Sequence, residues 1–262
     1  MDSAVFEQHA TVASWDEDYY HPISELYYDR AIATMLRLMD VPSGARVLDA
    51  GCGPGVHSVR VARAGHPVLA IDISRTMLDE ARARLTAAGL SSLVDFRQEN
   101  LMNLSFADGS FRYIFSWGVI IHIPDATEAL AELARILEPG GTLALYVTNR
   151  TALDHKIESV ARFLVRKPLD QERLQLGNGA WYQMHGQKLW LWQFDIPELE
   201  RALAKHGLKL ANRIIGEFSE VQRRVHGPLR RTLLRWNNLC YRLKLPPTCA
   251  AANLLIFRKN IS

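Results

Sequence analysis

Residues 47–55 read Val-Leu-Asp-Ala-Gly-Cys-Gly-Pro-Gly, and this stretch decides the fold. A short, mostly apolar segment, 46–50, runs into a turn with glycines at 51, 53 and 55, and helical sequence follows as far as residue 64. Glycines allow such a turn to be tight and let the backbone approach a ligand closely. In open parallel sheets, ligands bind where strands end and helices begin. The stretch therefore predicts a strand–turn–helix unit with a ligand site at the turn.

The same alternation continues along the chain. Ser74 and Asp125, the latter with Glu128 in a capping-box-like pattern, are expected to begin helices. Strand alternating with helix at this spacing indicates a parallel sheet covered on both faces. We predict an α/β, Rossmann-like, doubly wound and mostly parallel seven-stranded sheet, with helical insertions over its carboxyl edge. The expected strands are 46–50, 67–72, 93–97, 112–117, 142–148, 208–215 and 251–258, and the expected helices include 24–39, 74–88, 125–137, 197–206 and 226–244.

Four parts follow from this pattern. Residues 1–45 are expected to form an N-terminal helical lid, 46–148 the ligand-binding core, 149–194 an aromatic-rich cap insertion, and 195–262 the end of the sheet with an inserted basic amphipathic helix (219–246). That helix places Leu229, Leu233, Trp236, Cys240 and Leu243 on one stripe, opposite Arg231, Arg235 and Arg242.

Composition excludes several classes of protein. With 48% hydrophobic and 23% charged residues, the 262-residue chain is not disordered. Three cysteines without a CxxC spacing predict neither a disulfide scaffold nor a metal site. The start has no signal-peptide pattern and no apolar run is long enough to span a membrane, so a cytoplasmic location is expected. Residues 219–262 carry nine arginines and lysines against one acid, although the net charge of the whole chain is only +3.

The charged residues around the turn limit the class of ligand that can bind there. A dinucleotide motif needs glycine where Val56 stands, and a Walker phosphate loop is absent. Asp49 would repel a pyrophosphate but suits a cationic ligand. Asp72 ends the second strand, where an acid can accept hydrogen bonds from both ribose hydroxyls, and Ile73 can cover an adenine face. S-adenosylmethionine combines an adenosine with a cationic tail, and the site favours it over a NAD or nucleotide-sugar ligand.

Five stretches in order resemble class I S-adenosylmethionine-dependent methyltransferases of the small-molecule branch, which includes quinone, sugar and natural-product enzymes. They are VLDAGCGPG (47–55), AIDIS (70–74), ENLMNLSFADGSF (99–111), SWGVIIHIPD (116–125) and LARILEPGGTLAL (133–145). The resemblance covers roughly residues 24–148. It implies cofactor contacts from the following residues: Tyr28, Asp49, Gly51, Cys52, Gly53, Gly55, Asp72, Ile73, Asn100, Leu101, Trp117 and Gly118. Asn100 stands where the family usually has Asp.

The acceptor side is expected in the cap. His122, after the fourth strand, and His185 are the candidate general bases, while His57 is expected to pack. The candidate acceptor contacts are Tyr20, Trp181, Tyr182, Trp190 and Trp192, of which the tryptophans could equally form a small core. The basic helix could be a solvated face, contact an anionic acceptor, or meet an anionic membrane surface.

The expected activity is methyl transfer from S-adenosylmethionine to an O, N or C atom of a small-molecule acceptor, with an anionic or lipid-like acceptor favoured by the aromatic and basic residues of the insertions. A cofactor-binding regulatory or scaffold protein without transfer activity is the alternative, and it would lack a usable acceptor cavity. Nucleic acid is disfavoured as a partner, because the fourth-strand motif lacks the Asn/Asp-Pro-Pro-Tyr/Phe pattern of base-amino methyltransferases. The oligomeric state stays open.

Overall fold

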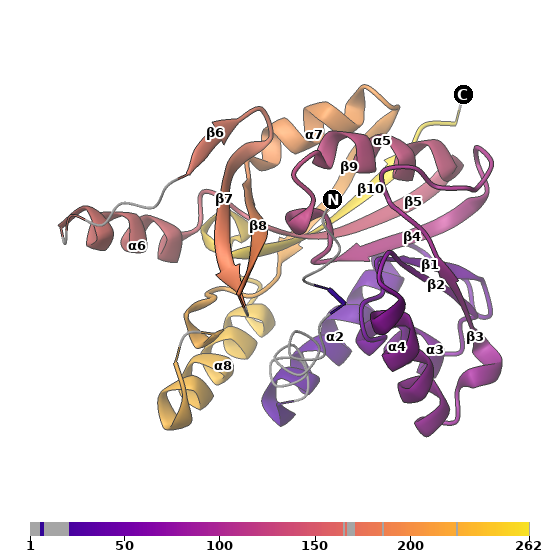
Figure 1. Ribbon diagram of the computed structural model, residues 1–262, viewed down its shortest axis with the longest axis horizontal. Coiled ribbons are helices and arrows are strands. Elements are labelled where there is room, and N and C mark those ends of the chain that lie inside the picture. Colours follow the sequence, from indigo (N-terminus) through magenta and orange to yellow (C-terminus); the bar gives the residue numbers. More distant parts are fainter. Residues whose placement is uncertain are drawn as a thin grey trace.

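A seven-stranded sheet forms the centre of the computed structural model, which describes residues 6–7, 21–164, 166, 171–184, 186–223 and 225–261. The strand order is β3-β2-β1-β4-β5-β10-β9 (Figure 1), with β10 antiparallel to both of its neighbours and β1 to β5 parallel. The predicted mostly parallel seven-stranded sheet is confirmed. Its strands are β1 (Val47–Ala50), β2 (Val68–Asp72), β3 (Val94–Gln98), β4 (Phe111–Trp117), β5 (Leu137–Thr148), β9 (Leu208–Ile215) and β10 (Ala252–Lys259).

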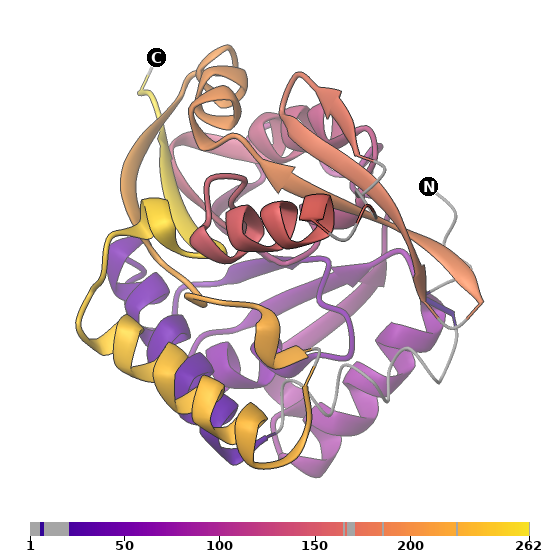
Figure 2. The ribbon, with the colours of Figure 1, turned by 90° about the vertical axis from the view of Figure 1, so that its left-hand side faces the viewer.

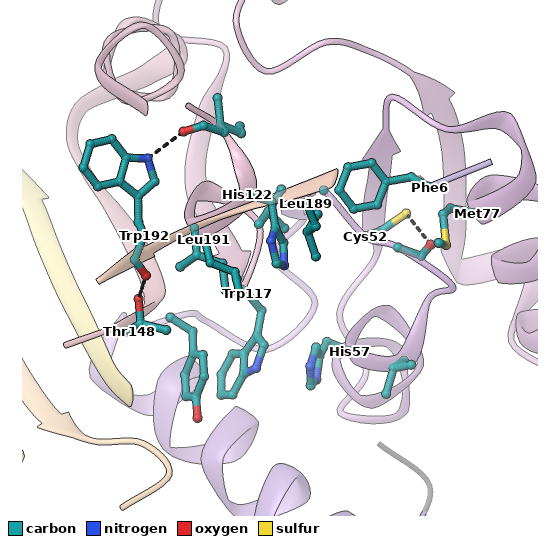
Figure 3. Close-up of a pocket in the computed structure, with 18 of the residues that line it drawn as sticks. Phe6, Cys52, His57, Met77, Trp117, His122, Thr148, Leu189, Leu191 and Trp192 are labelled. Atoms are coloured by element: carbon teal, nitrogen blue, oxygen red, sulfur yellow. Dashed lines mark hydrogen bonds between the residues drawn. The ribbon is translucent and has the colours of Figure 1, made fainter. Parts of the chain in front are cut away.

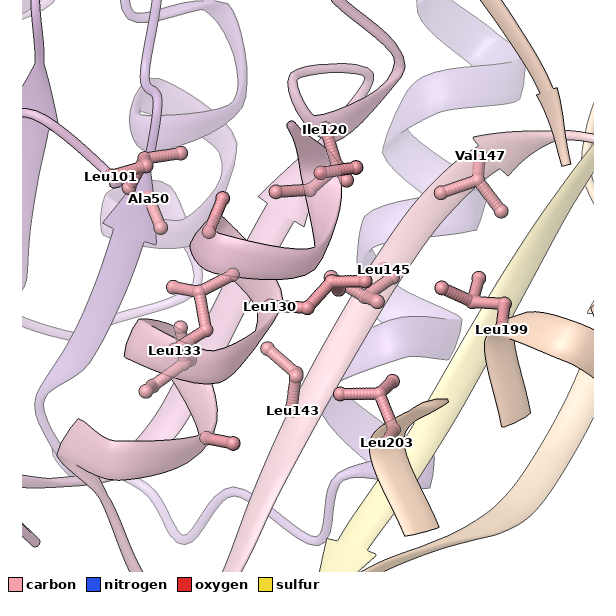
Figure 4. Packing of buried hydrophobic residues seen from close by; sticks show 14 of the residues in the cluster. Ala50, Leu101, Ile120, Leu130, Leu133, Leu143, Leu145, Val147, Leu199 and Leu203 are labelled. Atoms are coloured by element: carbon pink, nitrogen blue, oxygen red, sulfur yellow. The ribbon is translucent and has the colours of Figure 1, made fainter. Parts of the chain in front are cut away.

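Helices cover both faces of this sheet. Side chains alternate across a strand, so Val47 packs with one apolar cluster and Leu48 with the other. The first cluster holds α2 (Pro22–Leu38), α3 (Val56–Arg63) and α4 (Arg75–Ala87), and the second holds α5 (Ala126–Ile136) and α7 (Ile196–Ala204). Figure 4 shows leucines of α5 and α7 packed on Leu143 and Leu145 of β5. Short 3-10 turns are η2 (Ser91–Leu93), η3 (Ile120–His122), η4 (Val221–Arg223) and η5 (Pro247–Cys249).

The two expected helix caps differ in outcome. Ser74 accepts a hydrogen bond from the Met77 N–H (3.1 Å), as predicted. Asp125 precedes α5 but makes no side-chain capping bond. Its ψ of 55° lies outside the extended region from which an N-cap side chain reaches the first turn, so the capping-box prediction is wrong.

The aromatic-rich insertion is only partly helical. It holds α6 (Leu153–Leu164) and an antiparallel sheet of β6 (Glu172–Leu174), β7 (Gly177–Met184) and β8 (Gln187–Phe194), which stands over the carboxyl edge of the main sheet (Figures 1 and 2). Alternating apolar side chains in β8 favour a strand, so this insertion joins one helix to a small sheet, whereas the expected insertion 219–246 holds the long helix α8 (Gly227–Arg242). The Arg150 N–H donates to the Phe194 carbonyl (2.9 Å) and ties the small sheet to the end of β5.

Helix α8 (Gly227–Arg242) packs on α2 with a different face from the expected stripe. It buries Leu234, Asn237 and Cys240, while Leu229, Trp236 and Leu243 are exposed. The Asn237 amide exchanges two hydrogen bonds with the Ser219 backbone, and Asn238 accepts from Arg30 of α2 (3.0 Å). These polar contacts orient the helix, and periodicity alone does not detect them.

Candidate active site

One cavity of about 510 Å³ opens at the carboxyl edge of the sheet, between β1 and β4, where the strand order reverses. Its cofactor half is lined by the β1–α3 loop and by the ends of β2, β3 and β4. Its acceptor half is lined by η3, the end of β5, α6, β7, β8, η4 and the start of α8. Figure 3 places His122 between Phe6 on one side and Leu191 and Trp192 on the other.

Two glycines of the loop are required by geometry. Gly51 (φ 87°) and Gly55 (φ 78°) have left-handed backbones, which L side chains rarely adopt. A Cβ on Gly51 would also lie 2.5 Å from the Val119 side chain, and one on Gly55 would lie 2.9 Å from Ala81 Cβ. Gly55 packs the loop against α4 and does not line the cavity, so its role is to shape the loop.

Asp49 is a buried acid at the floor of the cofactor half. Ser58 Oγ donates to its Oδ2 (2.6 Å), but burial dominates and, with the charge of Asp72, raises the pKa of Asp49 to about 7. A cation bound beside this carboxyl would stabilise its charged form, which burial disfavours. The site therefore fits a sulfonium or ammonium ligand and disfavours a phosphate.

Asp72 lies at the end of β2, as predicted, and lines the cavity. The Gly53 N–H donates to its Oδ2 and the Ser74 N–H to its Oδ1, both at 2.9 Å. Burial raises its pKa to about 6. Each carboxylate oxygen keeps a second lone pair, so both can still accept a ribose hydroxyl. Ile73 lines the cavity beside it.

The adenine end differs in detail from the expectation. Asn100 and Leu101 line the cavity, but Asn100 Oδ1 accepts the Met102 N–H (3.0 Å) and so is already engaged in its own turn. Glu99, which sequence reasoning missed, also lines the cavity and is bound by Arg97 Nε (2.7 Å). Its position at the end of the third strand is the signal that could have found it.

Aromatic rings line the part of the cavity where the methionine end of the cofactor is expected. Trp117 and Gly118 line the cavity, and Trp117 stacks on Tyr146 with ring centroids 4.2 Å apart. Tyr28 does not line it. Its ring packs beside His57 in the core and its hydroxyl donates to Glu217 (3.2 Å), so the expected closure of Tyr28 over the cofactor is not seen.

His122 borders both halves of the cavity. Its Nδ1 lies 3.1 Å from the Trp190 carbonyl oxygen, which can only accept, so Nδ1 carries the hydrogen. Burial is the main cause that lowers the pKa of His122 to about 4. The ring is therefore neutral near pH 7 and is a weak base.

A second histidine lines the acceptor half, and no sequence motif predicts it. His155 of α6 donates from Nδ1 to the Asn149 carbonyl (3.0 Å), and its Nε2 lies 3.8 Å from Glu220 Oε2. Burial by itself lowers the pKa of His155, but Glu220, aided by Asp154, outweighs it and raises the pKa overall. Sixty-five positions separate His155 from Glu220 along the chain, and only the packing of α6 beside η4 brings them together.

The predicted aromatic contacts have different outcomes. Tyr182 lines the cavity with Leu189 and Leu191. Trp190 and Trp192 are both buried in one core cluster, and of these two only Trp192 also lines the cavity. Trp181 is half exposed and packs edge-on against Trp190 (5.2 Å between ring centroids). On a strand, neighbouring side chains point to opposite faces, which separates Trp181 from Tyr182. Tyr20 and His185 lie outside the described residues.

The cavity's cationic residues are not those of the expected basic face. Arg223 of η4 and Arg230 of α8 line the acceptor half, with Arg223 Nη2 donating to Glu217 (2.9 Å). Arg231, Arg235 and Arg242 are exposed and do not line it. None of the described helices is long and apolar enough to cross a membrane.

This fold and this site define a class I S-adenosylmethionine-dependent methyltransferase domain. Residues 47–141 match the methyltransferase domain family, so the chain carries a methyltransferase domain, with S-adenosylmethionine as its cofactor.

Similar proteins agree with this class. The chain is 35% identical over 144 residues to the methyltransferase GfsG of Streptomyces halstedii, covering 54% of this chain and 51% of that one. It is 39% identical over 111 residues to a ubiquinone biosynthesis O-methyltransferase of Xanthomonas axonopodis pv. citri, covering 42% and 46%. The chain thus spans about half the length of the curated relatives it matches.

Two solved structures share the fold at low identity. Magnesium protoporphyrin IX methyltransferase from Synechocystis, solved with bound S-adenosylhomocysteine, superposes with a TM-score of 0.65 at 17% identity, covering 98% of this chain and 97% of that one. The [4+2]-cyclase SpnF superposes with a TM-score of 0.59 at 18% identity, covering 89% and 81%. Identities this low show the fold alone.

Proposed function

We propose that this protein transfers a methyl group from S-adenosylmethionine to a small-molecule acceptor with an apolar body and an anionic group. The observation that carries the proposal is the single cavity that joins Asp49 and Asp72 to the cap residues Tyr182 and Trp192 and to Arg230 of α8. A cofactor-binding protein without transfer activity would have no use for this second half, so the cavity favours the enzyme over the regulatory alternative.

The chain's own residues have defined tasks in this scheme. When bound, S-adenosylmethionine supplies a methyl group on a good leaving group, which the acceptor atom displaces in line. Asp72 would hold the ribose and Asp49 would stabilise the cationic end. The Trp117 and Tyr146 rings form an apolar wall that excludes water, and alignment of the reactants supplies much of the acceleration.

An acceptor that carries a proton also needs a base. Neutral His122 is suited to orient the acceptor through a hydrogen bond, since a pKa of about 4 makes it a poor proton acceptor near pH 7. His155, whose pKa Glu220 raises, is suited to take the proton at Nε2. His122 as base, as first expected from the sequence, is the competing assignment.

Two features support the class of acceptor. Leu189, Leu191 and Trp192 offer an apolar wall, and Arg223 and Arg230 place guanidinium groups at the same cavity. Because the relative from Xanthomonas is an O-methyltransferase by name, oxygen is the acceptor atom to test first.

The test has a binding step and a turnover step. Calorimetry on the full chain should detect S-adenosylmethionine and S-adenosylhomocysteine at micromolar levels, and NAD should not bind. The protein should then release S-adenosylhomocysteine when given pooled small metabolites, with a product heavier by one methyl group. Because a cyclase shares this fold, the assay must follow the methyl group itself. Cofactor binding without any methylated product from a broad acceptor panel would favour the regulatory alternative.

A further inference from the structure

Helix α6 turns an apolar face to solvent. Leu153, Ile157, Val160, Phe163 and Leu164 recur at helical spacing, and each is exposed, Ile157 at 60% and Phe163 at 77%. An amphipathic helix on the surface of a domain normally buries this face against the core. Here the opposite side of α6 packs against the protein, where His155 donates a hydrogen bond to the Asn149 carbonyl.

Helix α8 exposes a matching stripe on the same side of the molecule. Leu229, Trp236, Leu239 and Leu243 are exposed, Leu243 at 63%. Figure 2 shows α6 and α8 facing the viewer with the η4 segment between them. A groove between the helices is lined by Leu153 and Ile157 from α6 and by Leu233 and Trp236 from α8, with acidic side chains also among its lining residues. We call the exposed apolar residues of the two helices, together with Val221, the apolar face. A gathering of large exposed apolar side chains of this kind marks an interaction site.

Basic side chains flank this face. Arg231, Arg235 and Arg242 are exposed along α8, and so is Lys244 just beyond its end. None of the four forms an ion pair within the described part of the chain. Three acids line the groove: Asp154 accepts from the Glu220 N–H (3.0 Å), Glu220 faces His155, and Glu158 is partly buried. The face therefore combines apolar side chains with exposed cations of α8 that have no ion-pair partner among the described residues.

We propose that the apolar face docks on an anionic lipid bilayer, with α6 and α8 lying in the plane of the interface. Apolar residues that enter the headgroup region, flanked by arginines that meet anionic lipids, are the features of interfacial helices. A second copy of the chain fits less well, because a two-fold contact would set the same arginines against one another.

The docked surface adjoins the active site. His155 and Glu220 border both the groove and the acceptor half of the cavity. If the proposed methyl transfer holds, an acceptor dissolved in the bilayer would have a short route into the cavity. The docking itself does not depend on that activity.

Vesicle flotation with the full chain tests the proposal. The protein should float with vesicles of phosphatidylcholine mixed with phosphatidylglycerol, bind vesicles of phosphatidylcholine alone far more weakly, and lose binding as salt rises. Changing Arg231, Arg235 and Arg242 together to Gln should weaken partitioning roughly a hundredfold, since each cation near an anionic surface contributes about fivefold. Ile157→Ser with Phe163→Ser and Leu243→Ser should weaken it at least tenfold.

A matched control removes three exposed cations from other elements: Arg63, Lys205 and Lys209, each changed to Gln. It should bind vesicles as the wild type does. Every variant should bind S-adenosylmethionine like the wild type, which shows that it is folded. Equal binding to both vesicle types, no binding to either, or a dimer in light scattering that Phe163→Ser abolishes would each overturn the proposal.

Discussion

The cofactor half of the cavity is lined at the ends of β1, β2, β3 and β4, each at the point where the next turn begins, whereas the acceptor half gathers side chains from seven elements between η3 and α8. Asp49 and Asp72 reach the first half because parallel strands end at one edge. His155 and Glu220 meet in the second half only because α6 packs beside η4. Local rules thus position the cofactor residues, and tertiary packing positions the acceptor residues.

The largest expected effect lies in the acceptor half. Once an acceptor is found, His155→Gln should lower kcat about 10²–10⁴-fold if His155 takes the proton, with cofactor affinity unchanged. His122→Gln, at the border of the two halves of the cavity, should lower kcat far less. The reverse ranking would restore His122 as the base.

The pH profile of the same reaction separates a base from a structural residue. Only the neutral His155 can accept a proton, so kcat/KM should rise as pH rises through its pKa. Because Glu220 raises that pKa, Glu220→Gln should move the midpoint to lower pH. A profile that Glu220→Gln leaves in place would contradict the pairing.

In the cofactor half, Asp72→Ala should weaken S-adenosylmethionine binding at least tenfold, because it removes hydrogen bonds to a charged acceptor worth about 1.5–3 kcal/mol each. Calorimetry measures this, with the exposed Asp79→Ala as the control. Unchanged affinity in a folded variant would show that Asp72 is not the ribose anchor.

In the cofactor half, burial of Asp49 should lower the free energy of unfolding when its carboxyl is charged. Its pKa is raised to about 7 in the folded chain, so the folded state holds this proton more tightly than the unfolded state does. As the pH rises from about 4 to about 7, the ligand-free wild type should therefore lose stability relative to Asp49→Asn, reaching a difference of about 4 kcal/mol. Urea unfolding at pH 5 and pH 8 checks this, with exposed Asp95→Asn as the control; equal gaps at both pH values would contradict it.

The smallest effect distinguishes two neighbouring sets of arginines. Arg230→Gln, which lines the cavity, should raise KM for an anionic acceptor about fivefold. Arg231→Gln with Arg235→Gln should leave KM unchanged in a vesicle-free assay, since both point away from the cavity. A raised KM in the double variant alone would return acceptor binding to the outer face of α8.

The sequence by itself determined the alternation of strands and helices, the glycine turn, and the places of the acids at positions 49 and 72. It could do so because hydrophobic periodicity and glycine spacing are local signals. It could not show which side of α8 is buried. The hydrogen bonds of Asn237 with Ser219 and of Asn238 with Arg30 fix the orientation of this helix. Nor could it show that Tyr182 lines the cavity whereas its neighbour Trp181 is half exposed. Those outcomes depend on which residues far apart in the chain pack together, and that free energy exists only in the folded molecule.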